Sequence, residues 1–315
     1  MITEYEDSNT ELSTEEQFRK KLEVVIDRER FRELSESAAN ALHDQIMKRG
    51  EAAREVADVL HGKQLGHALH PVLTAVTIGS LTAGIIYDLF GFLPGFGGAA
   101  KSANSLTTFG TLSVLPTALT GLTDFSTIKH KSSHYGLAHG IVNTLAFLFY
   151  MKSVAARLSG KRATGFLYSA VGLSLFTVSS WIGGDMVYRQ GVATNHATEN
   201  GPEEWTPVLG LVDLEEEKPT AAELDDTRIL LFRQGDDVYA IGATCAHAGG
   251  PLEEGKVVDG VCIQCPWHQS VFDMRTGKVV HSPSTFNQPR YDVRIVDGQI
   301  EVRQPAYIPS EDDED

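Results

Sequence analysis

Cys245-Ala246-His247 and Cys265-Pro266-Trp267-His268 are two short stretches of this chain, separated by 17 residues. Each offers one thiol and one imidazole, which are common ligands of transition metals. A zinc finger usually draws on one closely spaced pair of cysteines and one closely spaced pair of histidines. Here each stretch mixes the two types, which suits a two-iron cluster with thiolates on one iron and imidazoles on the other. A zinc site with the same four ligands is the alternative.

Around these stretches, residues 208–303 resemble the Rieske [2Fe-2S] domain family. The resemblance implies a small antiparallel all-β domain that binds a [2Fe-2S] cluster and transfers single electrons. It also implies that Cys245 and Cys265 hold the inner iron. His247 and His268 would then hold the outer iron, at an exposed edge from which an electron can leave.

Nearby residues place the chain within that family. Gly250 and Trp267 stand where respiratory-chain members carry two further cysteines, joined as a disulfide. Ser270 matches a serine that points at the cluster in high-potential members, whereas Phe272 replaces their tyrosine. Because fewer hydrogen bonds would reach the cluster, we expect a reduction potential below that of quinol-oxidising members. The Cys-Pro-Trp-His loop, stiffened by Pro266, is similar to that of ferredoxins of ring-hydroxylating oxygenases.

The rest of the C-terminal region fits a β domain over residues 205–305. Residues 228–232 and 238–241 are β-type runs that flank Gly235-Asp236-Asp237, which predicts a hairpin. Cys262 lies in an apolar run, so we expect it in the core and not on the metal. An oxygenase would need a second iron site with two histidines and a carboxylate, but only His281 follows His268. The domain is therefore expected to move electrons and not to hydroxylate a substrate by itself.

Charge is distributed unevenly along the chain, whose formal net charge is −15 at pH 7. Residues 70–189 contain 3 acidic and 8 basic residues, whereas residues 190–315 contain 24 and 9. The acidic terminal region argues against a nucleic acid partner, because the phosphates would repel it. The middle region contains four runs without Asp, Glu, Lys or Arg, at residues 64–87, 102–123, 132–151 and 163–184.

These runs predict a bundle of four transmembrane helices within residues 63–189. A bilayer core needs about 20 helical residues, and the runs contain 24, 22, 20 and 22. The second run is the weakest, because it is rich in Thr and Ser and contains Pro116. From His67-Ala68-Leu69-His70-Pro71 onward, the region resembles a family of uncharacterised bacterial four-helix membrane proteins. Four buried helices of a soluble protein are the alternative.

Polar residues gather at one end of the expected membrane helices. His67 and His70 open the first helix, His139 lies near the start of the third, and Asp124 and Asp185 end the second and the fourth. All should lie in the leaflet that faces the β domain, and ionisable groups in membrane helices are often functional. One interpretation is a haem b held by His70 and His139, or a quinone pocket. The other is that these groups only tie helix ends together.

The flanking segments complete the domain organisation. Residues 1–62 predict a long amphipathic helix that begins at the capping box Ser13-Thr14-Glu15-Glu16. This helix would form a homo-oligomer or bind a partner, or else lie on the protein's own cytoplasmic face. Residues 190–204 predict a linker and residues 306–315 an acidic tail. Without a recognisable cleavable signal peptide, we expect a multi-pass protein of the cell membrane with the β domain and both termini in the cytoplasm.

These features predict a membrane-anchored one-electron carrier that works between unidentified redox partner proteins. The exposed edge at His247 or His268 would pass the electron, and the acidic surface would steer a basic partner. The chain would then be an electron-transfer component of an oxidoreductase system. Two alternatives stay open: a quinone- or haem-linked membrane oxidoreductase, and a redox sensor in which the cluster switches the membrane domain.

Overall fold

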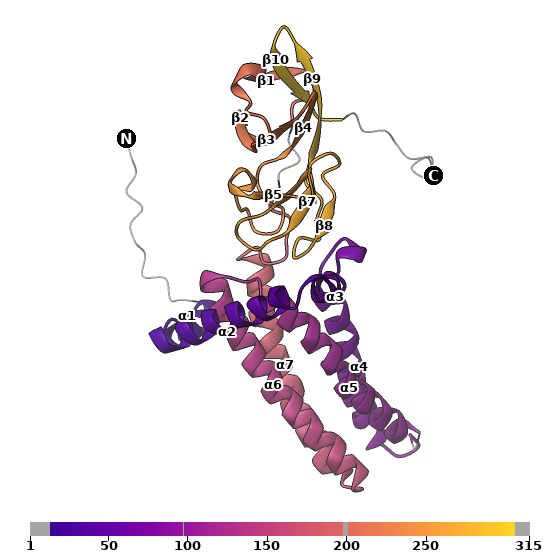
Figure 1. Cartoon of the computed structure of the whole chain (residues 1–315). Helices are drawn as coiled ribbons and strands as arrows, with labels where there is room; N and C mark the ends of the chain where they lie inside the picture. Colours follow the sequence, from indigo (N-terminus) through magenta and orange to yellow (C-terminus); the bar gives the residue numbers. More distant parts are fainter. Residues whose placement is uncertain (1–12, 97, 198–200, 306–315) are drawn as a thin grey trace, which may run out of the picture.

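The structure is a computed structural model that describes residues 13–96, 98–197 and 201–305. It consists of a helical part and a β domain that stands on one end of the helices (Figure 1). The expected acidic tail and residues 198–200 of the expected linker lie outside the described residues. The domain boundaries predicted from the sequence remain predictions.

Four long helices form a bundle below the β domain: α4 (Leu69–Gly91), α5 (Ala99–Phe125), α6 (His130–Leu158) and α7 (Arg162–Tyr188). They run alternately away from the β domain and back, and each overlaps one of the predicted uncharged runs. They pair as two hairpins, α4 with α5 and α6 with α7. Because α5 also contacts α6 and α4 contacts α7, helices α4 and α6 are diagonally opposed across the bundle.

The bundle has the surface and interior of a membrane protein. Large apolar side chains such as Leu112, Leu115 and Leu119 are 52–60% exposed on its outside. Small residues let the helices approach closely inside, and a Cβ at Gly110 would lie 2.6 Å from the Leu81 side chain. Among the described residues, α4, α6 and α7 are long and apolar enough to cross a bilayer. The 27-residue α5 lacks comparable hydropathy, so the apolar criterion supports three of the four expected spans.

Opposite the β domain, a buried ion pair ties the two hairpins together. Arg157 of α6 donates two hydrogen bonds to the Asp88 carboxylate of α4, one of them at 3.0 Å. Arg162 of α7 donates to the same carboxylate at 3.3 Å. The Asp88 and Arg157 side chains are 0% and 3% exposed. This cluster fixes the distance between the far ends of the hairpins.

The N-terminal region differs from the single long helix that its periodicity predicts. It forms three helices, α1 (Thr14–Ile26), α2 (Glu29–Lys48) and α3 (Glu51–His61). The break between α2 and α3 lies at Gly50, whose φ of 77° is outside the helical range and is easiest for glycine. The capping box is present, since Ser13 Oγ accepts from the Glu16 N–H at 3.2 Å and the Glu16 carboxylate accepts from the Ser13 N–H at 2.7 Å.

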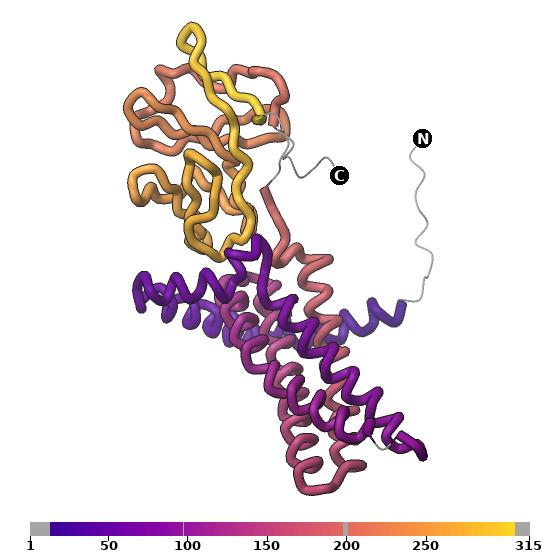
Figure 2. Tube along the Cα trace, turned by 90° about the vertical axis from the view of Figure 1, so that its right-hand side faces the viewer, coloured from indigo at the N-terminus to yellow at the C-terminus, as the bar shows by residue number. Residues whose placement is uncertain are grey.

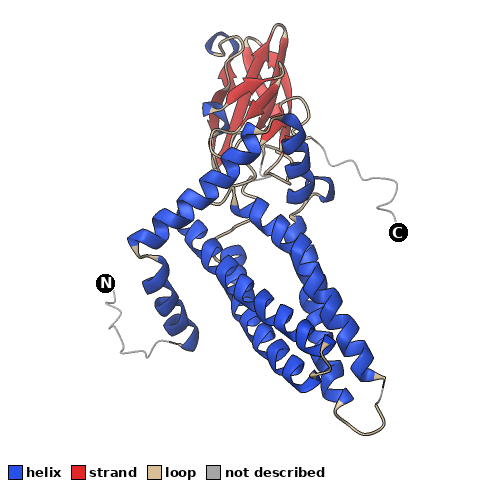
Figure 3. Cartoon of the chain, turned by 60° about the horizontal axis from the view of Figure 1, so that its bottom comes forward, coloured by secondary structure: helices blue, strands red, loops and turns tan. Residues whose placement is uncertain are grey.

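Helices α1 and α2 lie across the end of the bundle that faces the β domain (Figure 3). Ile26 packs in a cluster with Tyr135 and Met186. Ser35 donates to Ser133 at 3.1 Å. These contacts favour the interpretation in which the N-terminal region lies on the protein's own bundle. A homo-oligomer through this region stays a prediction.

The β domain contains two antiparallel sheets, with strand orders β1-β10-β9-β4-β3-β2 and β5-β6-β7-β8. The predicted hairpin is β3 (Thr227–Gln234) with β4 (Asp237–Gly242), and it places Phe232 opposite Tyr239. The other strands are β1 (Thr206–Gly210), β2 (Thr220–Leu224), β5 (Lys256–Val258), β6 (Cys262–Gln264), β7 (Val271–Asp273), β8 (Val279–His281), β9 (Arg290–Val296) and β10 (Gln299–Arg303).

The smaller sheet lies nearer the helices, and its loops reach the bundle (Figures 1 and 2). Its core is apolar and includes the fully buried Leu252, Ile263 and Phe272. Both cysteines of the candidate metal site belong to this core. The expected ligands therefore sit at the base of the β domain, beside the helices.

Candidate metal centre at the base of the β domain

The four expected ligands come from two loops that close in the same way. In the loop after β4, the Gly249 N–H donates to the Cys245 carbonyl at 2.8 Å. In the loop after β6, the Gln269 N–H donates to the Cys265 carbonyl at 3.0 Å. Gly249 and Gln269 occupy equivalent positions, and both have a positive φ, 78° and 66°. Each loop thus turns back on its cysteine and presents the thiol to the other loop.

The two thiols form the buried half of the site. Cys245 and Cys265 are each 1% exposed. A hydrogen bond between the two side chains raises the pKa of Cys245 and lowers the pKa of Cys265. Backbone N–H groups two and three residues after each cysteine hydrogen-bond to its sulfur. Such groups stabilise the thiolate, which is the form that binds a metal.

The two imidazoles form the other half. The Nδ1 atoms of His247 and His268 lie 3.2 Å apart. Two nitrogens that bind one metal at about 2 Å each are separated by about 3 Å. Burial lowers the pKa of His247 well below 6.5. Burial, reinforced by the charge of Lys129, lowers the pKa of His268 to about 4. Both rings are therefore neutral at pH 7, as metal coordination requires.

This pairing distinguishes the zinc and two-iron interpretations. Within the described ranges, no group of three or more His, Cys, Asp or Glu side chains is placed to hold a single metal ion. Sulfur instead faces sulfur and nitrogen faces nitrogen. The side chains thus fit a cluster with two thiolates on one iron and two imidazoles on the other.

The residues expected around the cluster lie where they can act on it. A Cβ at Gly250 would lie 3.0 Å from Cys265 Sγ and 3.0 Å from the Trp267 ring, so the close approach requires glycine. Ser270 is fully buried and accepts from the Ser284 N–H at 2.9 Å, which leaves its own O–H as a donor. The Trp267 side chain beside Pro266 is 53% exposed. Their roles at a cluster remain predictions.

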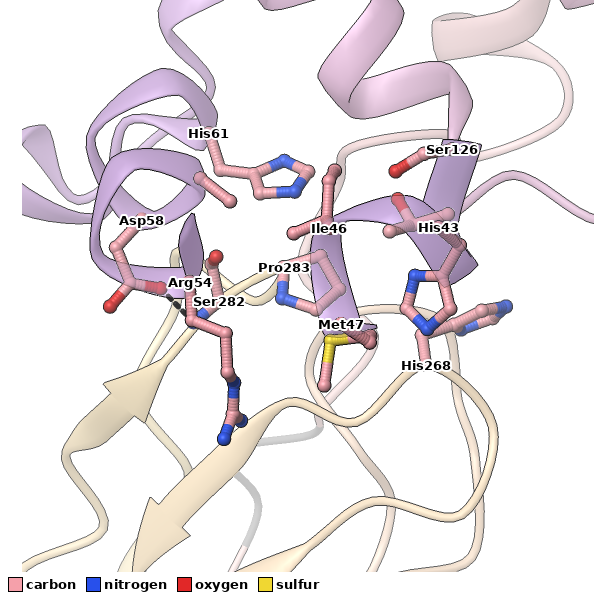
Figure 4. A pocket seen from close by; sticks show the side chains of 12 residues that line it. His43, Ile46, Met47, Arg54, Asp58, His61, Ser126, His268, Ser282 and Pro283 are labelled. Atoms are coloured by element: carbon pink, nitrogen blue, oxygen red, sulfur yellow. Dashed lines mark hydrogen bonds between the residues drawn. The ribbon is translucent and has the colours of Figure 1, made fainter. Parts of the chain in front are cut away.

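The histidine edge is buried at His268 and half-buried at His247, whereas the resemblance implies an exposed edge. His268 is only 5% exposed and lines a cavity with His43, Met47 and His61 (Figure 4). His247 lines a second cavity, which also contains His61. Helices α2 and α3 cover the edge, because the chain folds its own N-terminal region over the base of the β domain.

Two hydrogen bonds connect the covering helices to their surroundings at this point. The Gln269 amide donates to His43 Nε2 at 3.1 Å, which joins the second cluster loop to α2. His61 Nδ1 lies 2.8 Å from the Asp124 carboxylate, which joins α3 to the end of α5. His61 therefore lies between both metal-site histidines and the bundle.

Asp58 of α3 fixes the β domain to the helices. Its carboxylate accepts from the Ser282 N–H at 2.8 Å and from Lys63 Nζ at 3.0 Å, and it lies 3.1 Å from His281 Nδ1. Burial would raise the pKa of Asp58, but the hydrogen bonds from Ser282 and Lys63 outweigh burial and lower it. Lys63 also donates to the Val280 carbonyl at 2.6 Å. A buried carboxylate and its donors thus hold β8 against α3.

The polar residues of the expected membrane site do not form one cluster. His70 and His139 are half-buried and lie close together between the two hairpins, with ring centroids 6.3 Å apart. Asp124 instead binds His61, and Asp185 accepts from Arg19 of α1 at 2.8 Å. His67 is exposed, and its Nδ1 lies 3.3 Å from the neighbouring Ala68 carbonyl.

Sequence reasoning missed His43, Asp58 and His61. They lie in a region whose amphipathic pattern explained them as part of a surface helix. Gln269 and His43 are 226 residues apart in the chain, so no local pattern could have joined them.

Comparisons with known proteins agree with this geometry. Residues 204–292 match the Rieske [2Fe-2S] domain, and residues 66–196 match the family described as predicted membrane protein (DUF2231). The anthranilate 1,2-dioxygenase ferredoxin subunit of Burkholderia cepacia is 40% identical over 105 residues, which are 33% of this chain and 96% of that protein. The 3-phenylpropionate/cinnamic acid dioxygenase ferredoxin subunit of Escherichia coli (strain K12) is 33% identical over 81 residues, which are 26% of this chain and 76% of that protein.

Among solved structures, the ferredoxin of carbazole 1,9a-dioxygenase from Nocardioides aromaticivorans IC177 is 34% identical. The match covers 31% of this chain and 96% of that one, with a TM-score of 0.30. The similarity to the two ferredoxin subunits extends over most of their length, and the Rieske match at residues 204–292 contains both candidate metal-binding loops. The chain therefore belongs to the Rieske [2Fe-2S] family, and it carries this electron-transfer domain behind a DUF2231 membrane domain.

Proposed function

We propose that the protein is a membrane-anchored one-electron carrier whose histidine edge serves the membrane side. Cys245, Cys265, His247 and His268 would hold the [2Fe-2S] cluster, which accepts and releases one electron when bound. The buried thiol pair and the neutral imidazole pair suit this role, and the backbone N–H groups would stabilise negative charge on the cysteine sulfurs.

The cover over His247 and His268 is the observation that carries the proposal. Electron transfer slows steeply with distance, so the favoured partner of this edge is whatever lies against it. Here that neighbour is the protein's own helical part. His61 lines the cavities of both imidazoles and binds Asp124 at the end of α5. The shortest route from the metal site therefore leads into the bundle.

A soluble partner would use another face of the same site. Trp267 is 53% exposed and packs beside Gly250 and Cys265, so it offers a path from the surface to the buried sulfur pair. The relatives described above are ferredoxin subunits of dioxygenases. A soluble redox protein that docks at Trp267 fits this relationship, and aromatic residues are enriched at such contacts.

Oxidation kinetics test this assignment. The full chain, with its cluster reduced, is placed in nanodiscs without oxygen and mixed with decylubiquinone or with ferricyanide. We expect Asp58→Asn, which loosens the docked edge, to slow oxidation by the membrane-dissolved quinone but not by ferricyanide. Asp44→Asn changes an exposed carboxylate of α2 and should alter neither rate. A quinone rate that does not change in Asp58→Asn would contradict the proposal.

A further inference from the structure

The bundle core contains a second site, built from one histidine of each hairpin. His70 of α4 and His139 of α6 belong to diagonally opposed helices, and both half-buried side chains lie between the two hairpins. Their ring centroids are 6.3 Å apart, and the ring planes are 83° apart. Facing side chains in a bundle core commonly hold cofactors. We propose that His70 and His139 are the two axial ligands of a haem.

Both imidazoles are held in the same tautomer. His70 Nδ1 lies 2.9 Å from the Thr117 carbonyl, and His139 Nδ1 lies 2.9 Å from the Ser179 carbonyl. A carbonyl can only accept, so each Nδ1 carries the hydrogen and each Nε2 carries the lone pair. A metal-binding histidine is oriented by this kind of bond to a backbone carbonyl.

The two hairpins build this arrangement with matching residues. Thr117 is followed four residues later by Gly121, and Ser179 by Gly183. A Cβ at Gly121 would lie 2.8 Å from the His70 ring, and a Cβ at Gly183 would lie 3.2 Å from the His139 ring. Helix α5 therefore supplies a carbonyl and a glycine against which His70 lies, and α7 supplies the same pair for His139. The duplication favours a shared role over two unrelated packing contacts.

The separation of the rings fits one iron between them. Two nitrogens at about 2 Å from a metal, each about 1 Å from its ring centre, place the centroids about 6 Å apart. His139 Nε2 accepts from the Asn143 amide at 2.9 Å, so its lone pair lies on that atom, and the Asn143 amide has to turn away before the atom can bind iron. One turn from His70 along the same face of α4, the buried Thr74 hydroxyl has no hydrogen-bond partner among the described residues.

The donor set selects haem over the other occupants. Within residues 13–96, 98–197 and 201–305, no third His, Cys, Asp or Glu joins this pair as a ligand. Two imidazoles alone leave most coordination positions of a transition-metal ion unfilled. A porphyrin supplies four further nitrogen ligands to its iron. A quinone carbonyl would need an N–H donor, but each N–H is already committed to a backbone carbonyl. The small residues Thr117, Gly121, Ser179 and Gly183 line this level of the core.

The site would lie directly below the cluster-bearing edge. Gly121, which touches His70, is three residues from Asp124, the partner of His61. Three helical residues rise by about 4.5 Å. A haem at this level would be a neighbour of the histidine edge. The proposed haem site depends on residues of the bundle alone, so it is independent of the proposed electron route.

Haem content of the purified full chain tests the inference. We expect the wild type, made with added 5-aminolevulinate, to hold one haem b per chain with a low-spin, bis-imidazole spectrum. His70→Ala and His139→Ala should each lose that spectrum, and added imidazole should restore it. His67→Ala changes an exposed histidine just before α4 and should keep the spectrum. The EPR signal of the reduced [2Fe-2S] cluster should persist in all variants, which separates haem loss from failure of the β domain.

If the His70→Ala and His139→Ala variants do not accumulate, hemin titration of the wild-type protein tests the inference instead. Wild-type protein from cells deprived of haem synthesis should bind one hemin per chain and give the same low-spin spectrum. Protein that binds no hemin, or that carries a bare metal ion in its place, would overturn the inference. So would His70→Ala and His139→Ala variants whose spectra match the wild type.

Discussion

Cys262 and Cys265 are two buried cysteines only three residues apart, but they face different surroundings. Cys265 hydrogen-bonds to Cys245, whereas Cys262 lies in strand β6, opposite Asp273 of β7. We expect Cys265→Ser to abolish the cluster, because a serine hydroxyl does not replace a thiolate ligand. Cys262→Ser should keep it. Iron and acid-labile sulfide per chain measure this, and cluster loss in Cys262→Ser alone would show that the ligands are assigned wrongly.

His43 makes the contact between the domains sensitive to pH. Burial, reinforced by the charge of Lys129, lowers the pKa of His43 below 6.5, and its Nε2 accepts from Gln269. When the domains separate, the His43 imidazole regains an ordinary pKa near 6.5. Below that pH the separated form is therefore protonated more readily than the docked form. Docking is therefore strongest above pH 6.5 and weakens as the pH falls below it.

Hydrogen exchange of α2 and of the loop after β6 measures this effect. Going from about pH 7.5 to about pH 5, exchange corrected for its intrinsic pH dependence should rise in both segments of the wild type. His43→Gln keeps a polar side chain without the titration, so its exchange should change less. Equal pH dependence in the two proteins would rule out His43 as the source.

The candidate metal ligands can be proposed from residue types alone, whereas the residues that surround them could not be predicted. One Cys and one His in each of two stretches encode the donor set locally, because each loop folds back on itself within a few residues. His43, Asp58 and His61 reach the site only through the tertiary fold. Their helical periodicity is the same whether the helix faces solvent or a second domain.

At the scale of elements, the contact of α3 with β8 depends on Asp58. Hydrogen bonds to a buried charged group contribute about 1.5–3 kcal/mol each. Asp58→Asn should therefore weaken docking by about 2 kcal/mol, seen as faster hydrogen exchange in both α3 and residues 279–283. Because the pKa of Asp58 is lowered, its contribution is present above about pH 4 and is lost as the pH falls further. Asp44→Asn is the matched control, and an equal effect in both variants would exclude the role of Asp58.

The buried pair of Asp88 and Arg157 joins α4 to α6 at the far end of the bundle. Removing one partner of a buried pair leaves an uncompensated charge and costs about 3–5 kcal/mol. We expect Arg157→Met to lower the thermal stability of the protein in detergent strongly. The double variant Asp88→Leu/Arg157→Met should recover much of the loss, and a double variant that is less stable than the single one would contradict this account.

Helices and strands were more predictable than their ends and partners. The uncharged runs predict α4 to α7 because lipid exposure demands long apolar helices, and Thr, Ser and Pro116 explain why α5 lacks the hydropathy of the others. The break at Gly50 was missed, since apolar spacing continues on both sides of it. Asp88 and Arg157 lie inside helices and are buried together, a pairing that local sequence does not encode.

At the scale of the whole molecule, the chain forms its own docking partner for the Rieske edge. The N-terminal helices, the end of the bundle and the base of the β domain meet at His247 and His268 (Figures 1 and 4). Domain order along the sequence could not predict this, because a polar linker permits a free domain as readily as a docked one. This docked arrangement is the basis for the proposed electron route through the membrane domain.

EPR of the reduced cluster in oriented membrane multilayers is the most direct test of this docking. A β domain fixed on the bundle holds the cluster at one angle to the membrane plane. The account predicts a spectrum that changes as the sample is rotated in the magnetic field, with a smaller change in Asp58→Asn. A wild-type spectrum that is the same at every angle would mean that the domain moves freely on its linker, and it would contradict the account.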